Sequence, residues 1–212
     1  MPHRLAEPVT TSGCPQPDRL RPEVEDVARC GCGPAYVPRE NVRREIQRLL
    51  ETLHGKIRPQ LLHVLAPLAA VRGHVAVLAD ERELEVRAAP GCEDEGLDGA
   101  EALGAVLCTV GEVDDRLEAM IATDGPLAAW IGQAIALAQL EMLEQLAAHS
   151  LAQRAAEYDL RPVRFVEPGV ATRSQRDLFH VLGPAPARLT DHGTMDPRMS
   201  YTFWVTLAGP GA

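Results

Sequence analysis

The stretch Arg164-Phe-Val-Glu-Pro168-Gly169-Val170 begins the part of the chain that decides the fold. Its β-branched and aromatic residues over 163–166 predict a strand, and Pro168-Gly169 predicts a rigid turn after it. Three further elements are predicted beyond this turn: a helix over 174–182, a strand over 187–190 and a strand over 201–207. The mixture of helices and strands without regular alternation indicates an α+β fold, not a doubly wound α/β sheet.

The upstream sequence adds more elements of both kinds. Apolar residues at positions 42, 46, 49, 50 and 53 lie on one face of a predicted helix over 38–54. A long apolar helix is predicted from residue 126 to about 158, with Asp124 as its cap, and should be the central helix of the fold. The remaining predicted elements are a short helix over 61–71, an antiparallel hairpin over 74–79 and 83–88, a buried strand over 104–111 and a helix over 114–121.

The composition excludes several classes of protein. The chain has 212 residues, of which 46% are hydrophobic, so it is long enough to bury a core. Its net charge of -9 and lack of a basic stripe argue against a nucleic-acid partner. We find no run of about 18 apolar residues, as a membrane helix needs, and no signal-peptide pattern. A cytoplasmic location with no membrane partner is therefore expected, with the five cysteines present as thiols.

Residues 1–35 differ in character from the rest. They contain several prolines and glycines and three of the five cysteines, without a sustained apolar period. This pattern predicts an irregular arm before a single domain over 36–212. Deletion of residues 1–34 is accordingly predicted to leave the thermal midpoint nearly unchanged.

The cysteines are weak candidates for a metal or redox site. Cys14, Cys30 and Cys32 together offer three thiols, but structural zinc sites use C-x₂₋₄-C pairs and four ligands. The alternative is a reduced arm without metal. Cys92 lies among carboxylates, which should raise its pKa and make it a poor nucleophile, and Cys108 should lie in the core.

Arg164 is the leading candidate for ligand binding. Its guanidinium is a planar fork that can hold a carboxylate through two parallel hydrogen bonds, and Gly169 lets backbone groups approach a ligand. Glu167 is close enough in sequence to compete for the same guanidinium. Met195-Asp-Pro197-Arg-Met-Ser200 is expected to rim the same cleft, the alternative being a loop that only connects strands.

The order of these motifs resembles the activation domain of cobalamin-dependent methionine synthase. That domain has an Arg near a Pro-Gly, a short helix, and then Lys/Arg-Leu-Thr and Met-x-Pro-x-x-Ser. Matching segments here include Arg188-Leu189-Thr190 and, further upstream, Cys108-Thr109-Val110-Gly111 and Asp124-Gly125. The resemblance covers roughly residues 104–207.

The resemblance implies a fold and a ligand. The fold is a curved antiparallel sheet flanked by helices, and the ligand is S-adenosylmethionine. Cobalamin is expected only on a partner, because Asp191 and His192 are adjacent and lack the Asp-x-His spacing that ligates it. The implied ligand-binding residues, none of them catalytic, are Arg164, Glu167, Pro168, Gly169, Val170, Met195, Pro197 and Ser200.

Two departures from the family pattern concern the ligand. Arg164 stands four residues before Pro168 where the family has three, and Val170 replaces the Tyr that usually follows Pro-Gly. The first hypothesis is an accessory module that presents S-adenosylmethionine to a separate corrinoid methyltransferase protein, with a flavoprotein or another protein as electron donor. The alternatives are an interaction or regulatory domain that has lost the ligand, and a redox or metal protein using the cysteine arm.

Overall fold

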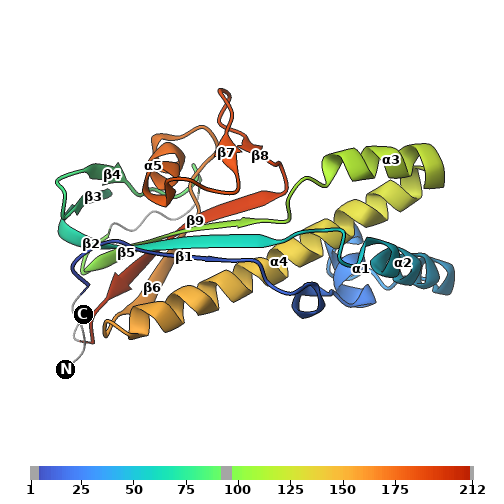
Figure 1. Ribbon diagram of the computed structural model, residues 1–212, viewed down its shortest axis with the longest axis horizontal. Helices are drawn as coiled ribbons and strands as arrows, with labels where there is room; N and C mark the ends of the chain where they lie inside the picture. The colour runs from blue at the N-terminus through green and yellow to red at the C-terminus, as the bar shows by residue number, and fades with distance from the viewer. Residues whose placement is uncertain (1–4, 92–96, 211–212) are drawn as a thin grey trace.

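The computed structural model describes residues 5–91 and 97–210 as a mixed α+β fold built on one antiparallel sheet (Figure 1). The order of the main path is β4-β3-β2-β5-β9-β6, and β1 pairs with β2. Every pairing in this sheet is antiparallel. The predicted fold class is therefore confirmed. The strands of this sheet are β1 (Val9–Gly13), β2 (Gln60–Arg72), β3 (Val75–Leu78), β4 (Glu83–Glu85), β5 (Ala102–Thr109), β6 (Arg161–Val166) and β9 (Ser200–Ala208).

Helices cover both faces of the sheet (Figure 1). The long helix α4 crosses one face, and α5 lies on the other beside a small hairpin of β7 (Arg188–Leu189) and β8 (Met195–Asp196). Three helices gather around the N-terminal half of α4. The helices are η1 (Pro17–Leu20), α1 (Val24–Cys32), α2 (Glu40–Leu53), α3 (Asp114–Asp124), α4 (Pro126–Ala156) and α5 (Arg173–Leu182).

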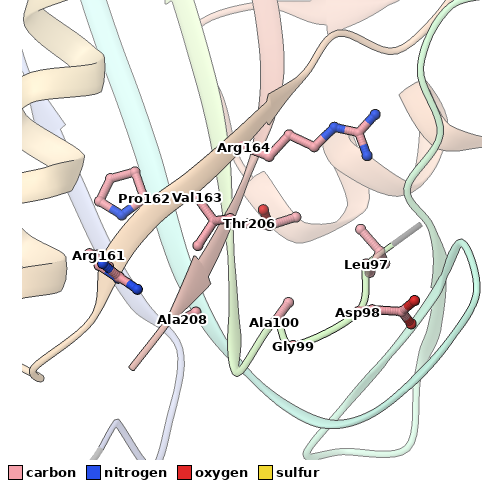
Figure 2. Close-up of a pocket in the computed structure, with 10 residues that line it drawn as sticks. All are labelled: Leu97, Asp98, Gly99, Ala100, Arg161, Pro162, Val163, Arg164, Thr206 and Ala208. Atoms are coloured by element: carbon pink, nitrogen blue, oxygen red, sulfur yellow. The ribbon is translucent and has the colours of Figure 1, made fainter. Parts of the chain in front are cut away.

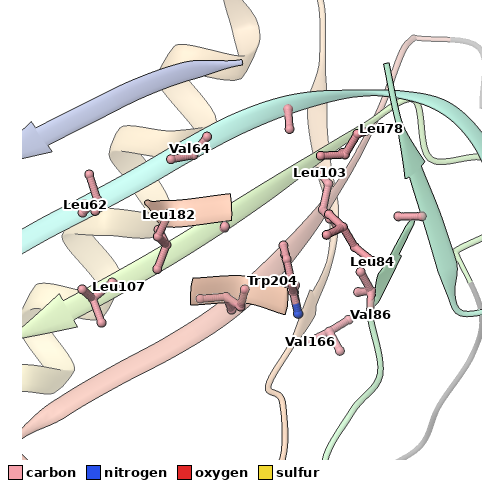
Figure 3. Packing of buried hydrophobic residues seen from close by; sticks show 14 of the residues in the cluster. Leu62, Val64, Leu78, Leu84, Val86, Leu103, Leu107, Val166, Leu182 and Trp204 are labelled. Carbon is pink, nitrogen blue, oxygen red and sulfur yellow. The ribbon is translucent and has the colours of Figure 1, made fainter. Parts of the chain in front are cut away.

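The side chains of the central strand β5 alternate between the two faces of the sheet, and all of them are buried. Leu103 and Leu107 point toward α5 and pack with Trp204 of β9 (Figure 3). Val106 and Cys108 point toward α4 instead. Gly104 also faces α4, and a Cβ there would lie 2.6 Å from Leu151 Cδ1, so glycine permits the close packing of helix on sheet.

The predicted central helix is confirmed as α4, with 31 residues. It is long and apolar enough to span a membrane, and is the only such helix in the described ranges, but 56% of its most apolar window is buried inside the fold. Contacts with the sheet on one side and with the smaller helices on the other account for that apolar surface. Asp124 does not cap it; the cap is Gly125, and the Asp124 carboxylate accepts a hydrogen bond from Arg48 at 3.0 Å.

The predicted helix over 61–71 is wrong, because this segment is the strand β2. β2 pairs with β1 and β5, and residues 61–66 are buried because their side chains enter the cores on both faces of the sheet. A strand buried on both faces has a continuous apolar run, and periodicity alone does not separate such a run from a buried helix.

The prediction of an irregular N-terminal arm is also wrong for the described residues. β1 extends the sheet, and α1 carries a capping box in which Glu23 and Asp26 each accept from the other's backbone N–H. Leu20, Val27 and Ala28 are almost fully buried against the body of the fold. The elements are too short to show a sustained apolar period, but each buries its few apolar side chains.

His63 on β2 is a buried polar group beneath this N-terminal cover. Its Nε2 lies 3.1 Å from Ser150 Oγ of α4, and its Nδ1 has no partner. Burial, reinforced by the nearby Arg154, lowers the pKa of His63 to about 4. The folded protein therefore holds this imidazole neutral at pH values where an exposed histidine takes up a proton.

His63 should make the protein less stable as the pH falls. Between about pH 6.5 and pH 4 the unfolded chain binds a proton that the folded chain excludes, so unfolding becomes easier toward acid, by roughly 3 kcal/mol at the lower limit. Urea unfolding of wild type and His63→Gln across this window tests the prediction. The variant should lose most of the slope, whereas His192→Gln, at an exposed loop position, should keep it. Equal slopes in wild type and His63→Gln would contradict it.

Candidate functional site

The edge strand β6 lines a cleft of about 760 Å³ on the sheet (Figure 2). The wall opposite β6 is the segment that leads into β5, and the end of β9 lies between the two. The lining residues are Leu97, Asp98, Gly99, Ala100, Arg161, Pro162, Val163, Arg164, Thr206 and Ala208.

Two arginines of β6, Arg161 and Arg164, line this cleft. Three residues separate them, so strict alternation would place Arg161 and Arg164 on opposite faces. The pairing register with β9 shifts between Pro162 and Arg164, so Arg161 pairs with Ala208 and Arg164 with Thr206. An irregularity of this kind re-aims side chains at a sheet edge. The sequence prediction found Arg164 and missed Arg161, because no sequence signal marks the shift.

The cleft combines both signs of charge with apolar walls. Arg164 extends from β6 over the cleft, and the Asp98 carboxylate lies on the opposite wall (Figure 2). Guanidinium groups bind carboxylates and a carboxylate binds an ammonium group, so the two walls suit the two ends of an amino acid. Leu97 and Val163 add apolar surface, and the outer edge of β6 has no strand partner in the described sheet.

The Pro168-Gly169 turn packs inside the protein and does not line the cleft. A Cβ on Gly169 would lie 3.0 Å from both Pro90 Cδ and Thr172 Cγ2, so glycine is needed for contact between two chain segments. Thr172 then caps α5 by accepting a hydrogen bond from Gln175 N at 3.2 Å. Pro168 is buried and Val170 is exposed.

Glu167 lies on the other side of the sheet from the arginine cleft. It neighbours Tyr201, which packs on the α4 side, and Glu144 of α4. Burial, with Glu167 and Glu144 close by, raises the pKa of Tyr201. Burial also raises the pKa of Glu144, and the carboxylate of Glu167 adds to the effect.

The remaining predicted residues lie at the opposite end of β9. Ser200 Oγ lies 2.8 Å from Thr109 Oγ1 and 2.7 Å from the Pro197 carbonyl oxygen, so the hydroxyl holds β9 to β5. Met195 pairs with Leu189 in the small hairpin. Pro197 lines a separate cleft of about 670 Å³ that shares no residue with the arginine cleft. The predicted site residues therefore lie in several places.

The cysteines do not gather. Cys30 Sγ lies 3.4 Å from a carboxylate oxygen of Glu141, and burial together with this carboxylate raises the pKa of Cys30 to about 11, which disfavours the thiolate that metals bind. Cys14 and Cys32 are exposed. Within residues 5–91 and 97–210, no three His, Cys, Asp or Glu side chains lie close enough to share a metal ion. Cys108 is in the core as predicted, and Cys92 lies outside the described residues.

Comparison with known proteins identifies the architecture. No protein-family description and no curated protein matches the chain. Among solved structures, the MetH reactivation domain bound to AdoHcy matches with a TM-score of 0.66 over 99% of this chain and 80% of that chain, at 17% identity. The chain has the fold of the MetH reactivation domain. The resemblance inferred from the sequence motifs is therefore confirmed at the level of the fold.

Proposed function

We propose that this chain binds an S-adenosyl amino acid in the β6 cleft and serves as an accessory module for a separate corrinoid methyltransferase protein. Two observations support the ligand class. The MetH reactivation domain, which shares the fold, was solved bound to AdoHcy. The β6 cleft carries two arginines on one wall and a carboxylate on the other.

The observation that carries the proposal is the opposite charge on the two walls of the cleft, with Arg164 on β6 and Asp98 across from it (Figure 2). In this arrangement the Arg164 guanidinium holds the ligand carboxylate, and Asp98 holds its ammonium group. Leu97 and Val163 supply apolar surface for the adenosyl moiety, and the outer backbone edge of β6 offers hydrogen-bonding groups for the adenine ring. A volume of about 760 Å³ falls in the range of small-molecule sites.

The proposed role of this chain is binding and orientation, without a catalytic residue of its own. S-adenosylmethionine supplies a methyl group, and the corrinoid belongs to the partner. A flavoprotein or another electron donor completes the reductive reactivation that the resemblance implies. All of these components act in the cytoplasm in this proposal.

Calorimetric titration with AdoHcy tests the ligand assignment. Arg164→Ala should weaken binding by roughly tenfold to a hundredfold, because it removes a charge-assisted contact to the carboxylate. Arg161→Ala should weaken binding less, because it removes only a further positive charge from the same cleft. Both arginines also interact with other groups of the protein, so the thermal midpoint of each variant must be measured alongside.

Arg44→Ala is the matched control, because Arg44 is an exposed arginine of α2 that pairs with Glu40, far in sequence from β6. It should leave AdoHcy affinity unchanged. Absence of binding to the intact wild type at millimolar AdoHcy would reject the ligand, and an equal loss in Arg44→Ala would reject the cleft.

An interaction domain is the second candidate function, and the outer face of β6 favours it. Val163 and Phe165 are 62% and 54% exposed on this edge strand, and the Phe165 ring lies 5.8 Å from that of Phe203. An apolar surface beside an open strand edge suits protein contacts. Retention of the fold with no AdoHcy binding would favour this function over the first.

A further inference from the structure

We propose that the cleft at the opposite end of β9 binds a small molecule that carries a phosphate group and at least two negative charges. This second cleft has a volume of about 670 Å³. It lies where the ends of β5 and β9 meet the loop before α3, next to β7 and β8 (Figure 1). Four cationic side chains line it, from three separate parts of the chain: Lys56, Arg58, Arg116 and Arg188.

The acidic residues of the lining, Glu112 and Asp196, offset only part of this positive charge. Arg188 pairs with Asp196 at 2.9 Å. The side chains of Lys56, Arg58 and Arg116 make no ion pair or hydrogen bond with the side chains that the structure describes in 5–91, 97–113 and 115–210. Glu112 is the other acidic residue of the lining. Gathering like charges costs energy that a bound anion offsets, and the overall charge of -9 makes an unpaired cationic cluster unusual for this chain.

Hydrogen bonds fix the floor of this cleft. Thr109 Oγ1 accepts from Gly111 N at 3.0 Å and lies 2.8 Å from Ser200 Oγ. Gly111 has a φ of +80°, and a Cβ there would lie 3.4 Å from the Arg58 carbonyl oxygen. Glycine therefore lets the loop before α3 lie against the Arg58 backbone, so that Arg58 and Arg116 line one cavity. Because these hydrogen bonds hold the backbone in place, binding of an anion to the cationic side chains does not require the backbone to become ordered first.

Two sequence motifs meet at this floor. Thr109 and Gly111 belong to the Cys-Thr-Val-Gly segment at the end of β5, and Pro197 and Ser200 belong to the Met-x-Pro-x-x-Ser segment. The proposed S-adenosyl site uses neither segment. Their convergence on a cationic cavity gives both segments a shared role in shaping it.

The geometry points to a small phosphate-bearing ligand. One carboxylate needs one guanidinium, whereas a pyrophosphate-type group has several oxygen atoms that three cations can share. Gln60 and Thr109 add polar groups to the same lining. A chain with a net charge of -9 does not fit an extended nucleic-acid backbone.

Titration with pyrophosphate at low salt tests this inference on the whole chain. Wild type should bind it, and the double variant Arg58→Gln/Arg116→Gln should bind at least about tenfold more weakly, because two charged contacts are lost. Arg44→Gln is the control, because it removes the charge of one exposed arginine outside the cleft. It should bind pyrophosphate as wild type does. The exposed positions of Arg58 and Arg116 predict unchanged thermal midpoints.

Three outcomes would overturn the proposal. They are no binding of millimolar pyrophosphate by wild type, an equal loss in Arg44→Gln, and displacement of pyrophosphate by AdoHcy. The last outcome would mean that the two ligands share one site. Affinity of the double variant for AdoHcy separates this inference from the proposed function, since it should stay at the wild-type value.

Discussion

Deletion of residues 1–34 is expected to unfold the protein at ambient temperature or to lower its thermal midpoint by more than about 10 °C, contrary to the prediction from sequence alone. The deletion removes Leu20, Val27 and Ala28 from the core and takes β1 from the edge of β2. Burial of one such leucine or valine contributes roughly 1.5–3 kcal/mol, so the sum is comparable with the whole stability of a domain. Thermal unfolding followed by circular dichroism measures the effect.

Two exposed cysteines provide the control for this deletion. Cys14→Ser and Cys32→Ser change the chemistry of the same segment without removing buried surface, and should shift stability by less than about 0.5 kcal/mol. Unchanged stability after the deletion would show that the packing of α1 and β1 contributes nothing. Instability in the serine variants would assign the effect to the thiols.

Trp204→Ala is expected to destabilise the fold by about 3–5 kcal/mol, which is the cost of removing a large aromatic side chain from a core. Trp204 is fully buried between β9 and α5, among Leu103, Val166 and Leu182 (Figure 3). Its indole N–H donates to Ser174 Oγ at 3.1 Å, so the truncation also removes a donor from a buried hydroxyl. Urea unfolding gives the free energy directly.

Trp204→Phe separates packing from hydrogen bonding. It keeps most of the ring volume and loses the N–H, so the loss should be smaller, about 1–2 kcal/mol. Ser174→Ala should cost a similar amount, because Ser174 Oγ also accepts from Arg87 N at 3.1 Å. A loss under 1 kcal/mol in Trp204→Ala would contradict the packing described for this face.

The sequence predicted elements well where the pattern was long and one-sided. The helix ending at Leu53, the α4 helix and the β3–β4 hairpin all lie where predicted. β2 was missed because its side chains are buried in the cores on both faces of the sheet, which removes the alternation that identifies strands. The N-terminal elements were missed because their stability comes from docking on α4 and β2, which local periodicity does not record.

The candidate site could be predicted only in part. Arg164 lines the β6 cleft, but its neighbour Arg161 depends on a register shift against β9, and Asp98 comes from a distant segment. Pro168 and Gly169 belong to a turn whose conformation is set by packing on residues 89 and 90. Residues adjacent in a motif can lie on opposite faces of a strand, which is why one motif contributes to several places.

The most direct test of the S-adenosyl site is to map AdoHcy on the intact protein by NMR chemical-shift perturbation. The proposed function predicts saturable shifts at the backbone N–H groups of residues 97–100, 161, 163, 164 and 206–208, with little change at those of residues 56–58, 60 and 109–116. The Arg164→Ala variant should require a higher AdoHcy concentration for the same shifts. No saturable shift in wild type, or shifts confined to residues outside the β6 cleft, would contradict the assignment.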